Sequence, residues 1–186
     1  MDDDGGSLAS RRRPLTRYTF DPEVSRASFD GRSSLHAMSH EVAGIEGHVD
    51  LEVLPDGAID GSTPPSAHLS IPVDRLRSGN SLQDNELRRR LDSSTHPNIE
   101  GELLEMTRVG RSQAYRVRGT VTLNGVTCEH EDEVMVEVID DRAIRLTGYS
   151  TFDVRDYGIS PPRLLLLKVD PMLTVRIDIR AVRPPA

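Results

Sequence analysis

The sequence GTVTLNGVTCEHEDEV, residues 119–134, predicts a β-hairpin. Val121 and Leu123 alternate with polar residues, which is the period of two expected of a strand with one buried face. Asn124-Gly125 then supplies the residue pair that most readily adopts positive φ in a short hairpin turn. A hairpin pairs its two arms in antiparallel fashion, and the rest of the chain can be compared with this pattern.

The returning arm of the hairpin places Cys128 and His130 on one face, within a run of carboxylates. A zinc site needs three or four ligands at about 2.0–2.3 Å, and Cys128 is the only cysteine in the chain. We therefore favour a structural hairpin with a solvated acidic second strand over a metal centre. His36 and His40 have the spacing of a helical metal pair, but no His-Glu-x-x-His sequence completes them, and we predict that they lie in a surface loop.

The period of two recurs from Tyr18 onward, in segments separated by turn sequences rich in Gly, Pro, Asp and Asn. Short connections favour an all-β antiparallel fold, and closure into a barrel removes the unpaired edges of the sheet. We predict an antiparallel barrel of about eight strands. The candidate strands cover about 17–20, 25–34, 44–54, 66–73, 98–107, 113–123, 126–139, 142–154 and 172–182.

One segment departs from this period. In residues 79–95, Leu82, Leu87 and Leu91 are separated by polar residues, with acidic residues early and Arg88–Arg90 late. This distribution of charge complements the dipole of a helix. We predict one short helix over about residues 81–92.

The composition argues against several classes of function. With 23 basic and 30 acidic residues the net charge is −7, which disfavours binding to nucleic acid or to an anionic membrane. A single cysteine excludes an internal disulfide, and no apolar run reaches the roughly 18 residues of a membrane-spanning helix. The chain has no Gly-x-Ser-x-Gly elbow and no phosphate-binding glycine loop, so we predict neither an enzyme activity nor a cofactor.

The first residues differ in composition from the rest. Residues 1–16 are dominated by Asp, Gly, Ser and Arg, which is typical of a disordered tail. They lack the apolar run of an export signal, and we expect a cytoplasmic protein. Residues 17–183 are predicted to form one barrel domain.

The order of these segments resembles that of the YceI-like, or polyisoprenoid-binding, proteins of bacteria. The resemblance runs from Tyr18 to about Ile179; each motif is weak alone, and their order is specific. It implies a lipocalin-like barrel whose lumen holds an isoprenoid or fatty-acid-like chain, and it implies binding without catalysis. The residues that carry it are Tyr18, Asp21, Pro22, Ser25 and Phe29, then Asp84, Leu87, Pro97 and Ile99, then Gly119, Leu123, Gly125, Val126 and Thr127, and finally Tyr157 within FDVRDYGIS.

Two functions stay open from the sequence. The first is a carrier that holds an apolar chain in the barrel lumen, and the second is a non-catalytic structural or protein-interaction module with a filled barrel. A lumen below about 300 Å³ would favour the second. Alternation and the family resemblance together predict that the lumen of a carrier is lined by Phe29, Ile71, Val117, Val121, Val136, Leu146, Phe152, Val175 and Ile177.

Residues 163–169, RLLLLKV, form the most apolar continuous stretch of the chain. Four consecutive leucines cannot all face one side of a strand, so two of them need a cover outside the barrel. Either the segment folds over the barrel mouth as a lid, or a second subunit covers the outward pair. On this basis we predict a homodimer through the Leu164–Leu167 region.

Overall fold

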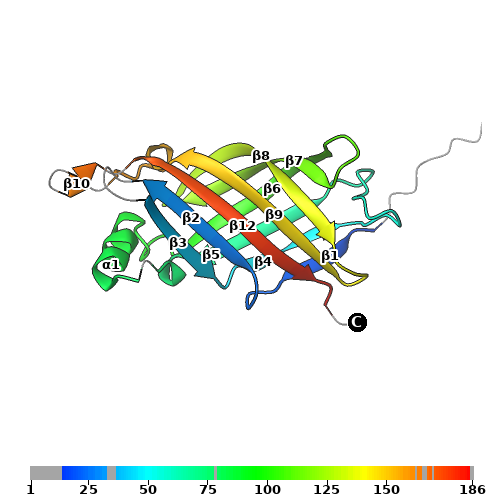
Figure 1. The fold of residues 1–186 in the computed structure, drawn as a ribbon, viewed down its shortest axis with the longest axis horizontal. Helices are drawn as coiled ribbons and strands as arrows, with labels where there is room; N and C mark the ends of the chain where they lie inside the picture. Colours follow the sequence, from blue (N-terminus) through cyan, green and yellow to red (C-terminus); the bar gives the residue numbers. More distant parts are fainter. Residues whose placement is uncertain are drawn as a thin grey trace, which may run out of the picture.

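A computed structural model describes residues 14–32, 37–77, 79–161, 163–164, 167–168 and 170–184. Within them eight antiparallel strands close a barrel, because the last strand returns to the first through the pairs Thr19↔Val182 and Phe20↔Ala181 (Figure 1). The predicted fold class is confirmed. In order around the barrel the strands are β1 (Thr16–Phe20), β4 (Glu46–Leu51), β5 (Ser66–Pro72), β6 (Asn98–Arg108), β7 (Ala114–Leu123), β8 (Val126–Val138), β9 (Ala143–Asp153) and β12 (Met172–Val182).

Strands β2 (Arg26–Arg32) and β3 (Ala37–Ala43) form a hairpin that extends this sheet. Both β1 and β2 pair antiparallel to β12, so they run in the same direction along it as two parts of one interrupted strand. At the interruption the fully buried Ser25 hydroxyl donates to the carbonyl of Arg180 and accepts from its N–H. Ser25 thus replaces the missing ladder bonds.

Strand β3 is not among the strands predicted from the sequence, and the predicted loop at His40 is wrong. His40 pairs with Phe29 across the β2–β3 ladder. The other histidine of that pair, His36, lies outside the described residues. Thr16 opens β1, so the predicted tail boundary at residue 16 is one residue too late; residues 1–13 lie outside the described residues.

The predicted helix is α1 (Ser81–Arg90), at one end of the barrel (Figure 1). The side chain of Asn80 accepts from the N–H of Leu82, which caps the helix start. The helix ends two residues earlier than predicted, because Asp92 adopts a left-handed conformation with φ of 44°. Two further short strands, β10 (Arg163–Leu164) and β11 (Leu167–Lys168), pair with each other near the same end.

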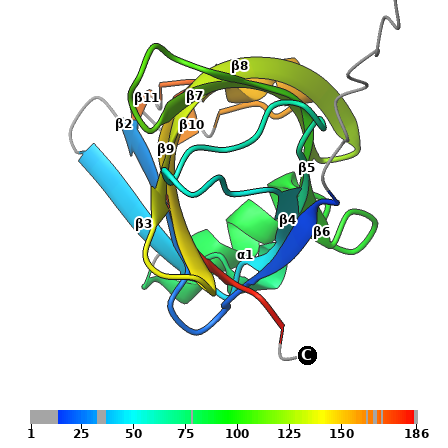
Figure 2. The same cartoon turned by 90° about the vertical axis from the view of Figure 1, so that its right-hand side faces the viewer.

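The opposite end of the barrel is covered by the connection between β4 and β5, which crosses the mouth (Figure 2). Ala58 and Ile59 of this connection are buried, and the N–H of Ile59 donates to the hydroxyl of Tyr115 at 2.8 Å. Tyr115 is a buried residue of β7. This bond therefore fixes the connection against the barrel wall.

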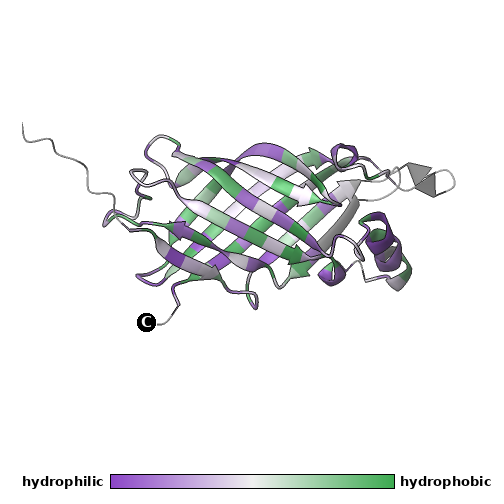
Figure 3. Ribbon diagram, turned by 180° about the vertical axis from the view of Figure 1, so that it is seen from behind, coloured by the Kyte–Doolittle hydropathy of each residue, from purple (hydrophilic) through white to green (hydrophobic). Residues whose placement is uncertain are grey.

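Polar and apolar residues alternate along the strands (Figure 3). In β8 the glutamates at 129, 131 and 133 are exposed, while Val136 is buried. Alternate side chains point to opposite faces of a strand, so the apolar rows face the interior and the charged rows face solvent. The interior is consequently apolar over most of its length.

The predicted Asn124-Gly125 turn joins β7 to β8 with positive φ at both residues, 53° and 74°. A Cβ on Gly125 would also lie 2.5 Å from Cε1 of His96. We expect Gly125→Ala to lower the free energy of unfolding by about 1–3 kcal/mol, the range for a strained left-handed residue. Gly61→Ala is the matched control, because a Cβ there meets nothing within 4 Å. Equal urea midpoints for the two variants would contradict this account of the turn.

Candidate functional site

The barrel encloses a cavity of about 290 Å³. Its wall is formed mainly by inward-facing aliphatic and aromatic side chains of all the barrel strands. A water molecule needs roughly 10–15 Å³ by the same measure, so the cavity is about twenty times larger than one water site. Packed protein interiors contain few voids larger than one water. The barrel is therefore hollow. Its volume lies just below the value of about 300 Å³ that was set above to separate a carrier from a filled barrel, so volume alone does not favour the carrier, and the case for a ligand rests on the apolar wall.

The cavity wall includes all nine residues that the sequence places in the lumen. These are Phe29, Ile71, Val117, Val121, Val136, Leu146, Phe152, Val175 and Ile177. Their position follows from the period of two, because each stands on the inward row of its strand. Their contact with a ligand remains a prediction.

Several glycines give this cavity its width. Gly101, Gly119 and Gly148 all belong to its wall. A Cβ on Gly119 would lie 2.6 Å from the carbonyl oxygen of Glu102, so this glycine lets two strands approach closely. At Gly101 a Cβ would make only ordinary contact, 3.6 Å from Cβ of Leu69. Gly101 is thus a position where a side chain would enter the cavity without displacing backbone.

Polar residues also belong to the wall, among them Glu100 and Glu102 of β6 and Thr120 of β7. His130, Asp132 and Ser150 lie in the wall on β8 and β9, and none of these three was predicted as a site residue. The predicted solvated acidic strand is wrong for Asp132, because the strand period turns His130 and Asp132 inward while Glu131 between them faces out. The alternation of residues along this strand already indicates that His130 and Asp132 point inward, but the run of charged residues favoured the interpretation of a solvated strand.

His130 is held by aromatic neighbours near η2 (Val154–Tyr157). Its Nε2 lies 2.5 Å from the hydroxyl of Tyr157, and its ring centroid lies 5.6 Å from that of Phe152. Burial, and secondarily the nearby Cys128 and Asp156, raises the pKa of the fully buried Tyr157. The phenol therefore keeps its proton, and its hydroxyl can donate to Nε2 when that nitrogen carries no hydrogen.

Cys128 lies on the same inward row, with its Sγ 3.7 Å from the carbonyl oxygen of Asp156. Among the described residues, no group of three or more His, Cys, Asp or Glu side chains has the geometry of a metal site. The thiol of Cys128 contacts the backbone of η2, and the interpretation of the hairpin as structural stays a prediction.

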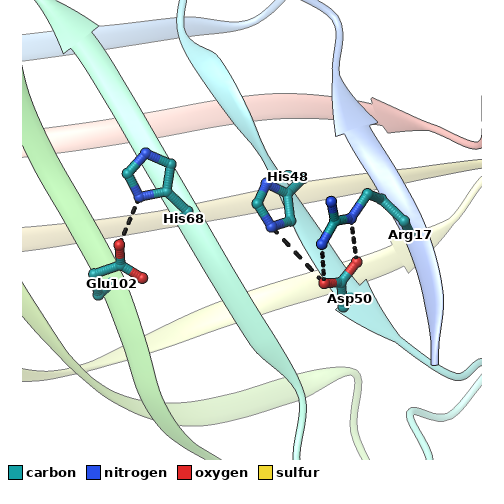
Figure 4. A network of polar contacts seen from close by, with 5 residues as sticks. All are labelled: Arg17, His48, Asp50, His68 and Glu102. Carbon is teal, nitrogen blue, oxygen red and sulfur yellow. Dashed lines mark hydrogen bonds and ion pairs between the residues drawn. The ribbon is translucent and has the colours of Figure 1, made fainter.

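A second polar cluster lies on the outer face of β1, β4, β5 and β6 (Figure 4). Arg17 donates two hydrogen bonds to Asp50, at 2.8 and 2.7 Å. His48 lies 3.8 Å from the same carboxylate, and His68 lies 2.6 Å from Glu102. These contacts join neighbouring strands in sequence around the barrel and face away from the cavity.

This cluster makes stability depend on pH. Hydrogen bonds from Arg17 lower the pKa of Asp50 below its ordinary value. A carboxyl with a lowered folded-state pKa adds stability above its unfolded pKa, about 3.9, and that stability is lost as pH falls through the folded pKa. We expect Asp50→Asn to lower the urea midpoint modestly at pH 7 and to match the wild type near pH 2.

The control for this prediction is Asp74→Asn, which removes an exposed carboxylate in η1 (Val73–Arg75). We expect its difference from the wild type to change little between the two pH values. A deficit of Asp50→Asn that persists undiminished at pH 2 would show that the Arg17–Asp50 pair is not its cause.

Comparison with known proteins agrees with this architecture. The polyisoprenoid-binding domain from Saccharophagus degradans implicated in plant cell wall breakdown is 16% identical, and the match covers 90% of this chain and 98% of that domain with a TM-score of 0.73. BcnA of Burkholderia cenocepacia is 13% identical, with 88% and 99% covered and a TM-score of 0.72. The YceI protein of Campylobacter jejuni is 12% identical, with 77% and 84% covered and a TM-score of 0.61.

These structures share the fold of this chain. A search of curated protein sequences gave no match. No helix among the described residues is long and apolar enough to cross a bilayer. A family model for the YceI-like domain matches residues 18–181, from the middle of β1 to the end of β12. Because this match spans the whole barrel, the chain belongs to the family of YceI-like domains.

Proposed function

We propose that this protein is a carrier that holds one apolar chain, an isoprenoid or a fatty-acid-like lipid, in the lumen of its barrel. The observation that carries the proposal is the hollow interior of about 290 Å³ with a mainly apolar wall. The name of the Saccharophagus degradans relative, a polyisoprenoid-binding domain of the same fold, supports the same class of ligand. The small volume favours a single slender chain over a bulky ring system.

The energetics of apolar burial suit such a carrier. Each methylene removed from water contributes about 0.8 kcal/mol, and ordering the chain offsets part of this gain. The predicted contacts are the nine residues Phe29, Ile71, Val117, Val121, Val136, Leu146, Phe152, Val175 and Ile177. Affinity would come mainly from the length of chain that the wall encloses.

The proposed role is binding without catalysis. Ser150, His130 and Asp132 share the cavity wall, and this combination of residue types occurs in hydrolases. A hydrolytic relay needs a serine hydroxyl bonded to the histidine, but Nε2 of His130 bonds to Tyr157. In the part of the chain that the structure describes, no hydrogen bond links Ser150 to His130. The three residues are better suited to contact a ligand than to activate a nucleophile.

The place of action and the oligomeric state also stay predictions. We expect a bacterial, cytoplasmic protein with no nucleic-acid partner and no cofactor other than the bound lipid. The proposed homodimer uses the Leu164–Leu167 region, where Leu165 and Leu166 lie outside the described residues. Sedimentation at high micromolar concentration tests it: a monomer there would favour the lid.

Native mass spectrometry of protein purified without detergent tests the carrier function. We expect a second species heavier than the polypeptide by the mass of one lipid, and organic solvent should remove this added mass. Protein that is always ligand-free, and that takes up no added prenol or fatty acid, would contradict the proposal. That result would favour a structural or interaction module instead.

A further inference from the structure

Strands β8 and β9 separate part of the way along the barrel. Their ladder runs from Val138↔Ile144 to Val134↔Gly148 and stops there. Beyond this point β8 continues to pair with β7, while β9 continues to pair with β12. The buried Tyr157 of η2 contacts His130 of β8 and Phe152 of β9, so η2 bridges the two diverging strands. At this place the wall is held together by contacts of η2 with both strands instead of by direct pairing of β8 with β9.

On β8 and β9 the polar residues of the cavity occur where the two strands diverge. His130 and Asp132 continue the inward row of β8 beyond Val134, and Ser150 continues the inward row of β9 beyond Gly148. Apolar residues occupy the same rows on the other side of the divergence, including Val136. On β8 and β9 these polar residues thus lie together in one segment of the cavity wall.

These side chains offer complementary hydrogen-bonding groups. When the hydroxyl of Tyr157 donates to Nε2 of His130, the ring hydrogen lies on Nδ1, which is then a donor. In the described residues no hydrogen bond or ion pair reaches the Asp132 carboxylate, which is an acceptor. Asp132 is half-buried and its carboxylate oxygens are reachable by solvent, so its acceptor sites are open to a polar group of a ligand that enters the cavity.

The charge of the wall restricts what that group can be. Among the residues that the structure describes, no lysine or arginine contributes to the cavity wall. A carboxylate or phosphate at the end of a ligand would meet the negative charge of Asp132 without a basic partner. A neutral hydroxyl, in contrast, can donate to Asp132 and accept from His130 at the same time. The two residues stand two positions apart on one strand, about 6.6 Å, which one oxygen atom can bridge through their side chains.

We propose that His130, Asp132 and Ser150 bind the terminal hydroxyl of a long-chain alcohol and discriminate against chains that end in an acid. This inference rests on the proposed carrier function and specifies the head group of its ligand. The apolar remainder of the alcohol would lie along the lumen toward Val136. The polar segment would therefore set both the chemistry and the direction of the bound chain.

Three probes with one chain test the inference: farnesol, farnesoic acid and farnesyl methyl ether, titrated calorimetrically into protein freed of lipid by solvent extraction. Because a hydrogen bond to a charged acceptor is strong, we expect farnesol to bind at least about tenfold more tightly than either other probe. Equal affinities, or tighter binding of the acid, would overturn the head-group assignment alone. No binding of any probe would overturn the carrier function itself.

Matched variants locate the effect. Asp132→Asn removes the inward charge and is expected to reduce the preference for farnesol over farnesoic acid to within about threefold. Glu131→Gln removes an adjacent charge that faces solvent, and it should keep the wild-type preference. Ser150→Ala should lower the affinity for farnesol without raising the affinity for farnesoic acid. A change in preference that is as large in Glu131→Gln as in Asp132→Asn would show a general effect of net charge and contradict the assignment.

Discussion

Replacing Gly101 with leucine is expected to weaken the binding of an apolar chain about a hundredfold while the barrel stays folded. Gly101 belongs to the cavity wall, and a Cβ there makes only ordinary contact with Leu69. The new side chain would occupy space that about four ligand methylenes would otherwise fill. At about 0.8 kcal/mol for each methylene, the loss corresponds to roughly two orders of magnitude in affinity.

The measurement is a calorimetric titration with farnesol, together with circular dichroism to verify the fold. Gly61→Leu is the matched control, because Gly61 lies in the β4–β5 connection with open space around its Cα. Wild-type affinity in a folded Gly101→Leu protein would mean that the chain binds elsewhere.

The second large effect is on stability. Ile144 in β9 is 0% exposed and lies between Val138 and Ala181 in the sheet register. Ala181 in turn pairs with Phe20 where the barrel closes. We expect Ile144→Ala to lower the free energy of unfolding by about 2–5 kcal/mol, the range for a large aliphatic residue truncated in a core.

Ile139 provides a control with the same chemistry at a different depth. It lies five residues earlier, after β8, and its exposure is 45%. Ile139→Ala should change the free energy of unfolding by less than about 0.5 kcal/mol. Urea unfolding of both variants gives the comparison. Similar losses for the two would mean that Ile144 does not pack in the closed core.

Most of the barrel follows from local patterns in the sequence. The alternation in residues 119–134 and the Asn124-Gly125 pair predict the β7–β8 hairpin, and the same period correctly places Val117 and Val121 on the inner face. These features depend only on strand geometry and turn chemistry. The barrel closure is less local: it depends on pairing between β1 and β12, which lie at opposite ends of the sequence.

The polar part of the cavity could not be predicted in the same way. A run of charges is usually a solvated face, and this expectation concealed Asp132 between two exposed glutamates. Where β8 and β9 diverge depends on η2 filling the gap, which no periodicity encodes. The hairpin β2–β3 was half missed, because His36 and His40 were assigned to a surface loop although residues 37–43 form β3.

The central claim is that an apolar chain occupies the lumen, and anomalous diffraction from crystals grown with 12-bromododecanol tests it most directly. The bromine marks the apolar end of the chain, so its peak reports where that end lies. We predict a peak inside the barrel, against Val136 and Leu146, in the hollow that the wall of β8 and β9 encloses. A lumen without bromine, or a peak only at an exposed residue such as Leu82 of α1, would contradict the account.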